Sequence, residues 1–305
     1  MNIIIQDTLN ERGRFEQTTT PRFNNIRTAD VMDQLQELGW QPVASRLVRS
    51  RDAERRAFAK HLVSLARVGE DKQVGEYLPR INLRNANDGS ASFELFAGFY
   101  RLICLNGLMV GTHYSSIRIR HSLSTDKLKE ALGNAVAHTE GEIQRSASVI
   151  KEWQNIILTP TQIGNLAGFA VGLRWASLFN GMEVEKIASA VGFPAGESFH
   201  PNVVSSRTSD FMREEFKARV KAVTEIRRVE DASPSLWHVF NRIQENVIRG
   251  GYNVNMPRRT QAGMDIRPRR MRTITSIAQS IDINRKLWDA TEAVQRGETL
   301  PVLIS

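Results

Sequence analysis

Apolar and polar residues alternate strictly over residues 76–84 of the chain. Such alternation predicts a strand with one buried face and one polar face, because successive side chains of a strand point to opposite sides. The polar face would carry Arg80, Asn82 and Arg84. A shorter alternation at 117–120 places Ile117 and Ile119 opposite Arg118 and Arg120 and predicts a further strand.

Residues 92–108, between these two strands, follow a different period. A turn signal at 87–90 precedes them, and Asp88 or Ser90 can cap a helix. Their large apolar residues recur at helical spacing: Phe93, Phe96, Phe99, Tyr100, Ile103 and Leu108. We therefore expect a buried helix here that covers one face of the sheet.

The segment upstream predicts one helix and two more strands. Thr28 suits the N-cap of a helix that ends at Gly39. Residues 40–50 look extended, and residues 58–68 fit either a strand or a helix. If residues 58–68 form a strand, then this strand, the extended segment 40–50 and the strand at 76–84 form a three-stranded antiparallel meander. The polar residues 1–27 are expected to be an arm or a loosely attached segment.

Downstream of Ser122 the pattern is mainly helical. Helices are expected at 125–158, from Pro160 onwards, at 210–229, at 236–248 with Ser233 as cap, and at 283–294. Residues 257–272 combine six arginines with two prolines, so we expect an arginine-rich loop. The fold class is α+β, with a small antiparallel β-meander packed on a long helix and a mostly helical C-terminal half. The expected divisions are 1–27, 28–124 and 125–305.

Charge narrows the class of partner. The 305 residues include 41 Lys+Arg and 33 Asp+Glu, a formal charge of +8. This excess suggests an anionic partner, with nucleic acid ahead of a membrane surface. The single cysteine, Cys104, excludes an internal disulfide and fits a reducing cytoplasm. The apolar run at 3–5 is too short for a signal peptide or a membrane span, so we expect a cytoplasmic protein without membrane attachment.

Catalytic motifs find little support. The sequence has no paired Cys or His spacing for zinc, no Gly-Lys-Ser/Thr phosphate loop and no Gly-x-Ser-x-Gly elbow. Asp88 with Glu94 could seat a magnesium ion, which keeps a metal-dependent nuclease as an alternative. Otherwise we expect no catalytic residue, no metal and no cofactor.

Arginine chemistry points to nucleic acid more directly. A guanidinium offers a planar fork to phosphates and can stack on bases, so a basic sheet beside an arginine-rich loop suits a backbone-reading surface. Aromatic platforms for extended strands would come from Trp40, Tyr77, Tyr114 or Tyr252. The candidate DNA-binding residues are Arg46, Lys60, Arg80, Arg84, Arg118, Arg120, Arg258, Arg259, Arg267, Arg269, Arg270 and Arg272.

Four segments carry a family resemblance: LRNANDGSASFELFAGFYRLICLNGLMVG, IRIRHS, LWHVFNRIQENVIRGG and DINRKLWDATEAV. They resemble the signature blocks of the YfjQ/YafZ/YubP family of uncharacterised plasmid, phage and prophage proteins, over roughly residues 28–290. That resemblance implies a setting in mobile elements and no particular activity.

The segment ADVMDQLQELGWQPV carries a second resemblance. It is similar to the opening of Erf-type chains, and the expected order of helix, strand meander and covering helix is similar to phage single-strand annealing proteins of the Erf, RecT and Red-beta class. Those proteins hold single-stranded DNA along a basic groove in rings. The resemblance is one of topology, and topology alone does not give function.

These observations together lead to one functional hypothesis. The chain would bind single-stranded DNA and promote annealing or recombination as a homo-oligomer, without a cofactor. Besides the nuclease, the alternative is a protein-interaction module that counters a host defence system. The sequence leaves open whether DNA or RNA is preferred and how many subunits assemble.

Overall fold

The computed structural model describes residues 8–13, 15–48, 52–69, 77–101, 107–109, 117–119, 121, 125–175, 206–298 and 300. The chain divides into two compact units. The first comprises Met1–Ser148 with Thr275–Ala278, and the second comprises Val149–Ile274 with Gln279–Ser305. Within the described ranges, none of the helices has the length and apolar character needed to cross a membrane.

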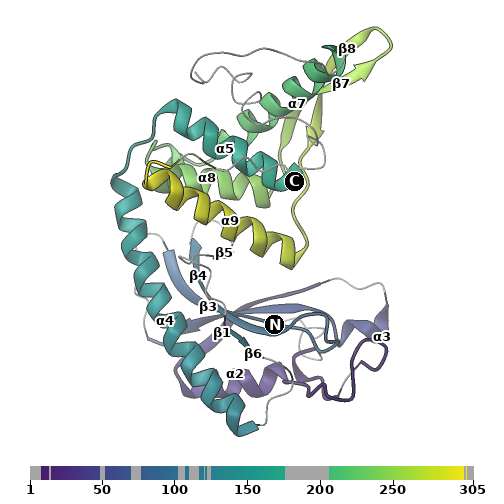
Figure 1. The fold of residues 1–305 in the computed structure, drawn as a ribbon, viewed down its shortest axis with the longest axis vertical. Coiled ribbons are helices and arrows are strands. Elements are labelled where there is room, and N and C mark those ends of the chain that lie inside the picture. The colour runs from purple at the N-terminus through teal and green to yellow at the C-terminus, as the bar shows by residue number, and fades with distance from the viewer. Residues whose placement is uncertain are drawn as a thin grey trace. The chain divides into compact units, whose positions relative to one another are not determined.

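The first unit is built on an antiparallel sheet (Figure 1). The alternating segments form the expected meander, in which β1 pairs with β2 and β2 with β3. Residues 58–68, which fitted either a strand or a helix, contain strand β2. Strand β4 pairs with β3 on one edge and with both β5 and β6 on the other. The strands are β1 (Trp40–Leu47), β2 (His61–Arg67), β3 (Tyr77–Asn85), β4 (Phe93–Arg101), β5 (Gly107–Met109) and β6 (Ile117–Ile119).

The expected covering helix at 92–108 is wrong, because its first part is strand β4. All residues from Phe93 to Phe99 are buried. A strand that is buried on both faces and paired on both edges is mostly apolar on both faces, here with Glu94 as the charged exception, and its sequence then lacks the period-two signature. Phe93, Phe96 and Phe99 are three residues apart, and this spacing is also typical of one face of a helix. The element order behind the similarity to the phage annealing proteins therefore differs from the one observed.

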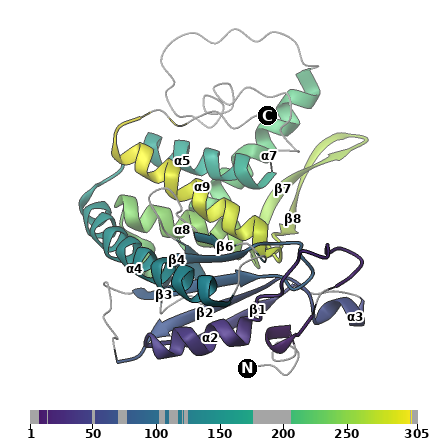
Figure 2. The same ribbon diagram turned by 60° about the horizontal axis from the view of Figure 1, so that its bottom comes forward.

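Helix α2 (Thr28–Glu37) packs against one face of this sheet (Figure 2). Val31 and Leu35 are fully buried, and the Thr28 hydroxyl lies 2.7 Å from Nε2 of His61 on β2. Asn85 of β3 donates to the same hydroxyl at 3.0 Å. These bonds fix the first turn of α2 over the neighbouring strands β2 and β3, because His61 and Asn85 are paired in register.

Helix α4 (Thr125–Asn155) confirms the expected long helix after Ser122. Its Glu140 accepts hydrogen bonds from the Trp40 indole at 3.1 Å and from Arg67 at 2.8 Å. Trp40 and Arg67 are cross-strand partners on β1 and β2. One carboxylate of α4 therefore holds the edge of the meander at the point where β1 begins.

The described N-terminal residues are packed rather than loosely attached, contrary to expectation. Leu9 and Ile26 are buried. Asn87 donates to the carbonyl of Thr8 at 2.8 Å, and the Thr18 hydroxyl donates to the carbonyl of Asp88 at 2.5 Å. Buried polar groups of the turn at 87–88 thus find their partners in this segment.

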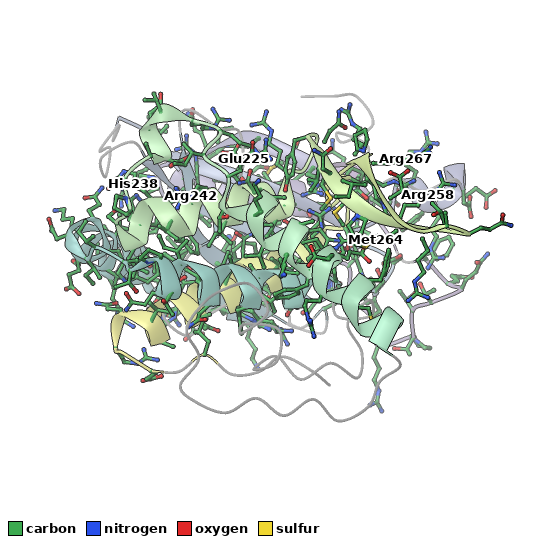
Figure 3. The ribbon with its side chains drawn as sticks, turned by 90° about the horizontal axis from the view of Figure 1, so that it is seen from above. Glu225, His238, Arg242, Arg258, Met264 and Arg267 are labelled. Carbon is green, nitrogen blue, oxygen red and sulfur yellow. The ribbon has the colours of Figure 1, made fainter. Side chains whose placement is uncertain are left out.

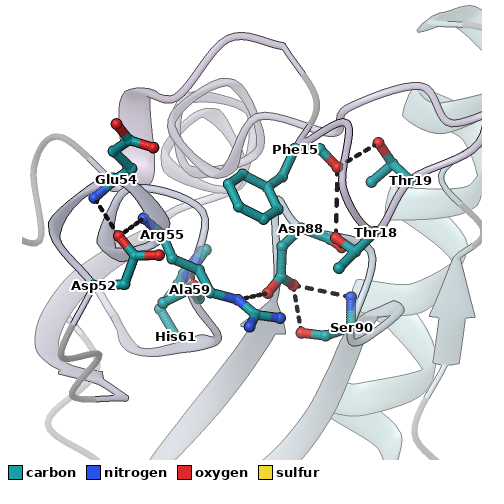
Figure 4. A network of polar contacts seen from close by, with 10 residues as sticks. All are labelled: Phe15, Thr18, Thr19, Asp52, Glu54, Arg55, Ala59, His61, Asp88 and Ser90. Carbon is teal, nitrogen blue, oxygen red and sulfur yellow. Dashed lines mark hydrogen bonds and ion pairs between the residues drawn. The ribbon is translucent and has the colours of Figure 1, made fainter.

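Asp88 closes this turn and does not cap a helix (Figure 4). Its carboxylate accepts a hydrogen bond from the Ser90 backbone at 2.9 Å and another from the Ser90 hydroxyl, and it lies 3.6 Å from Nε of Arg55. Arg55 belongs to the short helix α3 (Ala53–Arg56), which is capped by Asp52. Residues 52–56 therefore form a capped helical turn that faces the 87–90 turn.

A row of charged residues runs across the other face of the sheet. Register places Arg84 of β3 beside Glu94 of β4, and Glu94 beside Arg118 of β6. Glu94 is only 1 % exposed. Arg84 approaches one of its carboxylate oxygens to 2.7 Å, and Arg118 approaches the other to 3.2 Å. The buried carboxylate is therefore compensated from both neighbouring strands.

The second unit is mainly helical, as expected. An aromatic core joins Trp153, Trp237, Phe240 and Trp288, with ring centroids 4.3 to 6.2 Å apart. Thr159 caps α5 as expected, since its hydroxyl accepts from Gln162. Helix α8 is capped by Ser235, two residues after the predicted Ser233. The helices are α5 (Pro160–Trp175), α7 (Ser206–Thr224), α8 (Leu236–Ile248) and α9 (Ile277–Gln295).

The buried His61 makes stability depend on pH. Burial lowers its pKa from 6.5 to about 4, so the folded state favours the neutral imidazole. The unfolded chain binds the proton more tightly, so this stability is complete above pH 6.5 and is lost as the pH falls towards 4. We expect the free energy of unfolding in urea to fall by about 1.4 kcal/mol per pH unit in this window from His61 alone.

The variant His61→Gln separates this effect from other titrations. It should show a shallower pH dependence than the parent between pH 6.5 and 4, because glutamine does not titrate. Equal slopes for the two proteins would show that His61 is not the cause.

Glu94 gives a second stability prediction. Glu94→Gln leaves Arg84, whose side chain is 17 % exposed, without its carboxylate. Breaking a buried ion pair on one side is strongly destabilising, so we expect a loss of about 3 kcal/mol in urea unfolding. The matched control is Glu37→Gln at the exposed end of α2, which should change stability by less than about 0.5 kcal/mol. A loss for Glu94→Gln as small as this control would contradict the compensated-carboxylate description.

Candidate nucleic-acid interface

Four of the predicted sheet cations do share one face. The register aligns Arg46 with Leu62, Leu62 with Arg84, and Arg84 with Glu94, which in turn pairs with Arg118. Arg80 lies four residues from Arg84 on the same face of β3. Lys60 precedes β2 and is not part of a strand. Arg120 lies outside the described residues.

These arginines are held by internal partners. Arg46 donates to the carbonyl of Thr275 at 2.7 Å, and Arg80 donates to the carbonyl of Pro79 at 3.1 Å. Arg84 and Arg118 share the carboxylate of Glu94. The geometry therefore disfavours this face as a phosphate-binding surface, although the sequence predicted the right neighbours on it.

The arginine-rich segment 257–272 was expected to be a loop, and this expectation is wrong. It forms most of a β-hairpin made of β7 (Asn253–Thr260) and β8 (Gly263–Arg270). The two prolines exclude a helix but are tolerated in edge strands, where one side of each strand is unpaired. Gly263, with a φ of 126°, follows the two-residue turn at 261–262. Figure 1 shows the hairpin beside α7, extending from the other helices of its unit.

Pairing divides the hairpin into two faces. Val254 pairs with Arg269, Met256 with Arg267 and Arg258 with Asp265, and these residues share one face. The second face alternates with the first. It carries Asn253, Asn255, Pro257, Arg259, Met264, Ile266, Pro268 and Arg270.

An apolar cluster anchors the base of the hairpin. Val254 and Met256 are buried against Ala222 of α7 and Met271, with Tyr252 packed beside them. Backbone hydrogen bonds between Gly251 and Met271, and between Met271 and Tyr252, continue the pairing below the strands. Alternating apolar residues on one face thus decide which side of the hairpin turns inward.

Gly250 lets the two ends of the hairpin approach each other. Its φ is +57°, and a Cβ atom at this position would lie 2.6 Å from the carbonyl oxygen of Arg272. Only glycine tolerates both conditions. Arg174 of α5 donates to this carbonyl and to that of Val247. One half-buried guanidinium therefore ties the end of α8 to the residues that follow β8.

Helix α7 contributes polar contacts along the hairpin. Glu215 accepts a hydrogen bond from Arg219 at 2.5 Å and lies 3.9 Å from Arg269 of β8. Burial lowers the pKa of Arg219, whose guanidinium lies 4.5 Å from the centroid of the Trp175 ring. Near the turn, Arg259 lies over the ring of Phe211 at 4.9 Å. The helix therefore supports the hairpin from base to turn.

Much of the positive charge on the hairpin stays exposed. In Figure 3 the side chains of Arg258 and Arg267 extend from its strands. Arg267 binds Asp265 at 2.7 Å, and this hydrogen bond lowers the pKa of that carboxyl group. Within the described part of the chain, Arg258, Arg270 and Arg272 have no carboxylate at ion-pair distance. All six arginines are exposed: Arg258, Arg259, Arg267, Arg269, Arg270 and Arg272.

The other predicted candidates have structural partners. Trp40 is buried, and the Tyr252 hydroxyl donates to the carbonyl of Asn246 at 2.7 Å. The side chain of Tyr77 and all of Tyr114 lie outside the described residues. Asp88 and Glu94, the carboxylates of the nuclease alternative, are each engaged by arginine.

Sequence reasoning missed the contribution of α7 to this interface. Phe211 and Glu215 lie more than forty residues upstream of the arginines they contact, and no local pattern connects them. The strand itself left a signal, because Val254 and Met256 alternate with Asn253 and Asn255. That alternation could have predicted β7.

Comparisons with known proteins agree with the signature blocks. The chain is 27 % identical over 278 residues to UPF0380 protein YafZ and, equally, to UPF0380 protein YfjQ, both from Escherichia coli strain K12. Each alignment covers 91 % of this chain and 84 % of the relative. No solved structure matches the chain. The family model described as a domain of unknown function, DUF932, matches residues 17–288, and the chain belongs to this family.

Proposed function

We propose that the protein binds single-stranded DNA through the arginine hairpin and promotes strand annealing. One observation carries the proposal. Six exposed arginines lie between residues 258 and 272 on a hairpin that extends beside α7, and Asp265 is the acidic residue in this segment. Like charges gathered this densely repel one another, and a bound polyanion relieves that repulsion.

The spacing of the arginines supports a contact to the phosphate backbone. Arg267 and Arg269 are two residues apart on one face of β8, a rise of about 6.6 Å along a strand. An extended nucleic-acid strand repeats its phosphates at a comparable spacing. Each guanidinium can then reach a separate phosphate with a bidentate pair of hydrogen bonds, once Arg267 exchanges Asp265 and Arg269 exchanges Glu215 for the phosphate.

The distribution of charge in the first unit argues for the hairpin as the main contact. The sheet arginines are bound to Glu94 and to backbone carbonyls, so their charge is already partly compensated. Arg258, Arg270 and Arg272 can neutralise phosphates without first releasing a carboxylate. The proposal therefore assigns phosphate capture to the hairpin.

A salt titration tests this assignment. Replacing Arg258, Arg270 and Arg272 with alanine should flatten the dependence of log Kd on log salt concentration by about 2, since each lost single-strand phosphate contact removes about 0.7. The measurement is fluorescence anisotropy with a labelled oligodeoxythymidine between 50 and 300 mM salt.

The matched control removes the same charge elsewhere. Arg145, Lys286 and Arg296 have exposed side chains with local carboxylate partners, and replacing them with alanine should leave the slope close to that of the parent. Equal effects of the two triple variants would contradict the hairpin assignment. Absence of oligonucleotide binding at 50 mM salt would favour the protein-interaction alternative instead.

Annealing has its own test. The protein should accelerate the pairing of two complementary oligonucleotides, which is measured by energy transfer between their end labels. The variant with Arg258, Arg270 and Arg272 replaced should lose most of this acceleration. Annealing by this route brings two bound strands together, so the proposal includes an oligomer. Light scattering with and without DNA measures the oligomeric state. Tight binding with no acceleration of pairing would restrict the function to binding.

A further inference from the structure

A groove of about 570 Å³ lies between α7 and the second face of the hairpin. Its walls differ in chemistry. The hairpin side presents Asn253, Asn255, Pro257, Met264 and Ile266, and the helix side presents Lys221 among other residues. In Figure 3 Met264 lies beside α7. The proposed contacts between exposed arginines and phosphates do not involve this groove.

The hairpin wall of the groove is apolar near the turn. Met264 is 51 % exposed and Ile266 is 64 % exposed, and Ile266 pairs across the strands with Pro257. Large apolar side chains this exposed on an arginine-rich hairpin form a surface suited to a flat apolar partner. The faces of unpaired nucleobases have this character, and apolar contact with a base face, like stacking on an aromatic ring, does not depend on the base sequence.

Two amides stand next to this apolar wall. Asn253 and Asn255 are two residues apart on β7, so they lie on the same face, and both are exposed. Among the described residues neither side chain has a hydrogen-bond partner. An amide offers both a donor and an acceptor to the edge of a base. Those edges are free in a single strand but occupied by pairing in a duplex.

Charge around the groove fits a polyanion at its rim. Arg259 and Arg270 belong to the same hairpin face as the amides, one near the turn and one at the base. The two carboxylates that line the groove are already paired: Glu214 with Lys217 at 2.9 Å and Glu225 with Arg227 at 2.6 Å. Lys221 is exposed on the helix side. Phosphates can follow the rim while bases turn inward.

We propose that this groove holds unpaired bases of the single strand whose phosphates the hairpin arginines contact. The inference rests on the proposed function and adds a base-binding site to it. Apolar contact with Met264 and Ile266 and amide contact with Asn253 and Asn255 make binding depend on bases that are not paired. The site therefore selects single strands over duplexes.

The test compares two single strands of equal charge, one with bases and one without, and a duplex that carries about twice that charge, on the full-length protein. The probes are a labelled 15-residue oligodeoxythymidine, an abasic strand of the same length and a 15-base-pair duplex. The parent should bind oligodeoxythymidine about tenfold more tightly than the abasic strand, as expected for base contacts. Replacing Met264 and Ile266 with alanine should remove most of this difference while leaving abasic binding and its salt dependence unchanged.

Two further variants complete the design. Asn253→Ala with Asn255→Ala should reduce oligodeoxythymidine binding and leave abasic binding intact. Ile157→Ala with Val229→Ala truncates exposed apolar side chains of the same unit that do not line the groove and should change neither. Circular dichroism and the unfolding midpoint check that each variant is folded.

The outcomes separate the two proposals. Binding of oligodeoxythymidine and the abasic strand with equal affinity overturns the base-binding groove and leaves phosphate capture standing. Equal affinity for duplex and single strand also overturns the groove. Binding of none of the three probes at low salt overturns the proposed function itself.

Discussion

The exposed arginines of the hairpin depend on a small apolar anchor at its base. Like charges on two short strands oppose pairing, and an isolated hairpin is at best marginally stable in water. Val254 and Met256, buried against Ala222 and Met271, supply the burial that keeps the strands together. Arg174 closes the base through the carbonyls of Val247 and Arg272. The positive charge can remain on the surface because the anchor lies elsewhere.

Arginine serves two different purposes in this protein. In one set the guanidinium compensates a buried or half-buried carboxylate, as Arg84 does for Glu94 and Arg228 does for Glu245. Arg228 engages both oxygens of Glu245, at 2.8 and 2.9 Å, and that geometry favours arginine over lysine. In the other set, on the hairpin, the guanidiniums are exposed. The arginines that pair with buried carboxylates do not indicate a partner. The net charge of +8 therefore points to a partner only through the exposed arginines of the hairpin.

The hairpin and α7 form one surface with two kinds of chemistry. The arginines offer charge that recognises any phosphate backbone, and the groove offers apolar contact and free amides that suit unpaired bases. The arginines without the groove would bind single strands and duplexes alike. Together they give a physical reason why the ligand should be single-stranded, which net charge alone does not supply.

Local sequence pattern was sufficient to predict those elements that have one buried side and one more polar side. Strand β3 and helices α2 and α4 each have a buried and a more polar side, and the period of that difference can be read from the sequence. Residues 58–68, which contain β2, fitted either a strand or a helix. Strand β4 is buried on both faces, so its period vanished and its phenylalanines imitated a helix. The hairpin was misassigned because arginine and proline dominate its composition, although Val254 and Met256 alternate.

The sequence by itself therefore determined the α+β class and most helices, and it left the meander as one of two interpretations. Tertiary structure decided which of the basic residues are available. Arg84 and Arg118 share the single carboxylate of Glu94 because register brings three strands together. Glu215 of α7 lies 3.9 Å from Arg269 of β8, fifty-four positions later in the chain. Pairing between distant residues leaves no periodic trace in the sequence, since each partner sees only its own neighbours until the chain has folded.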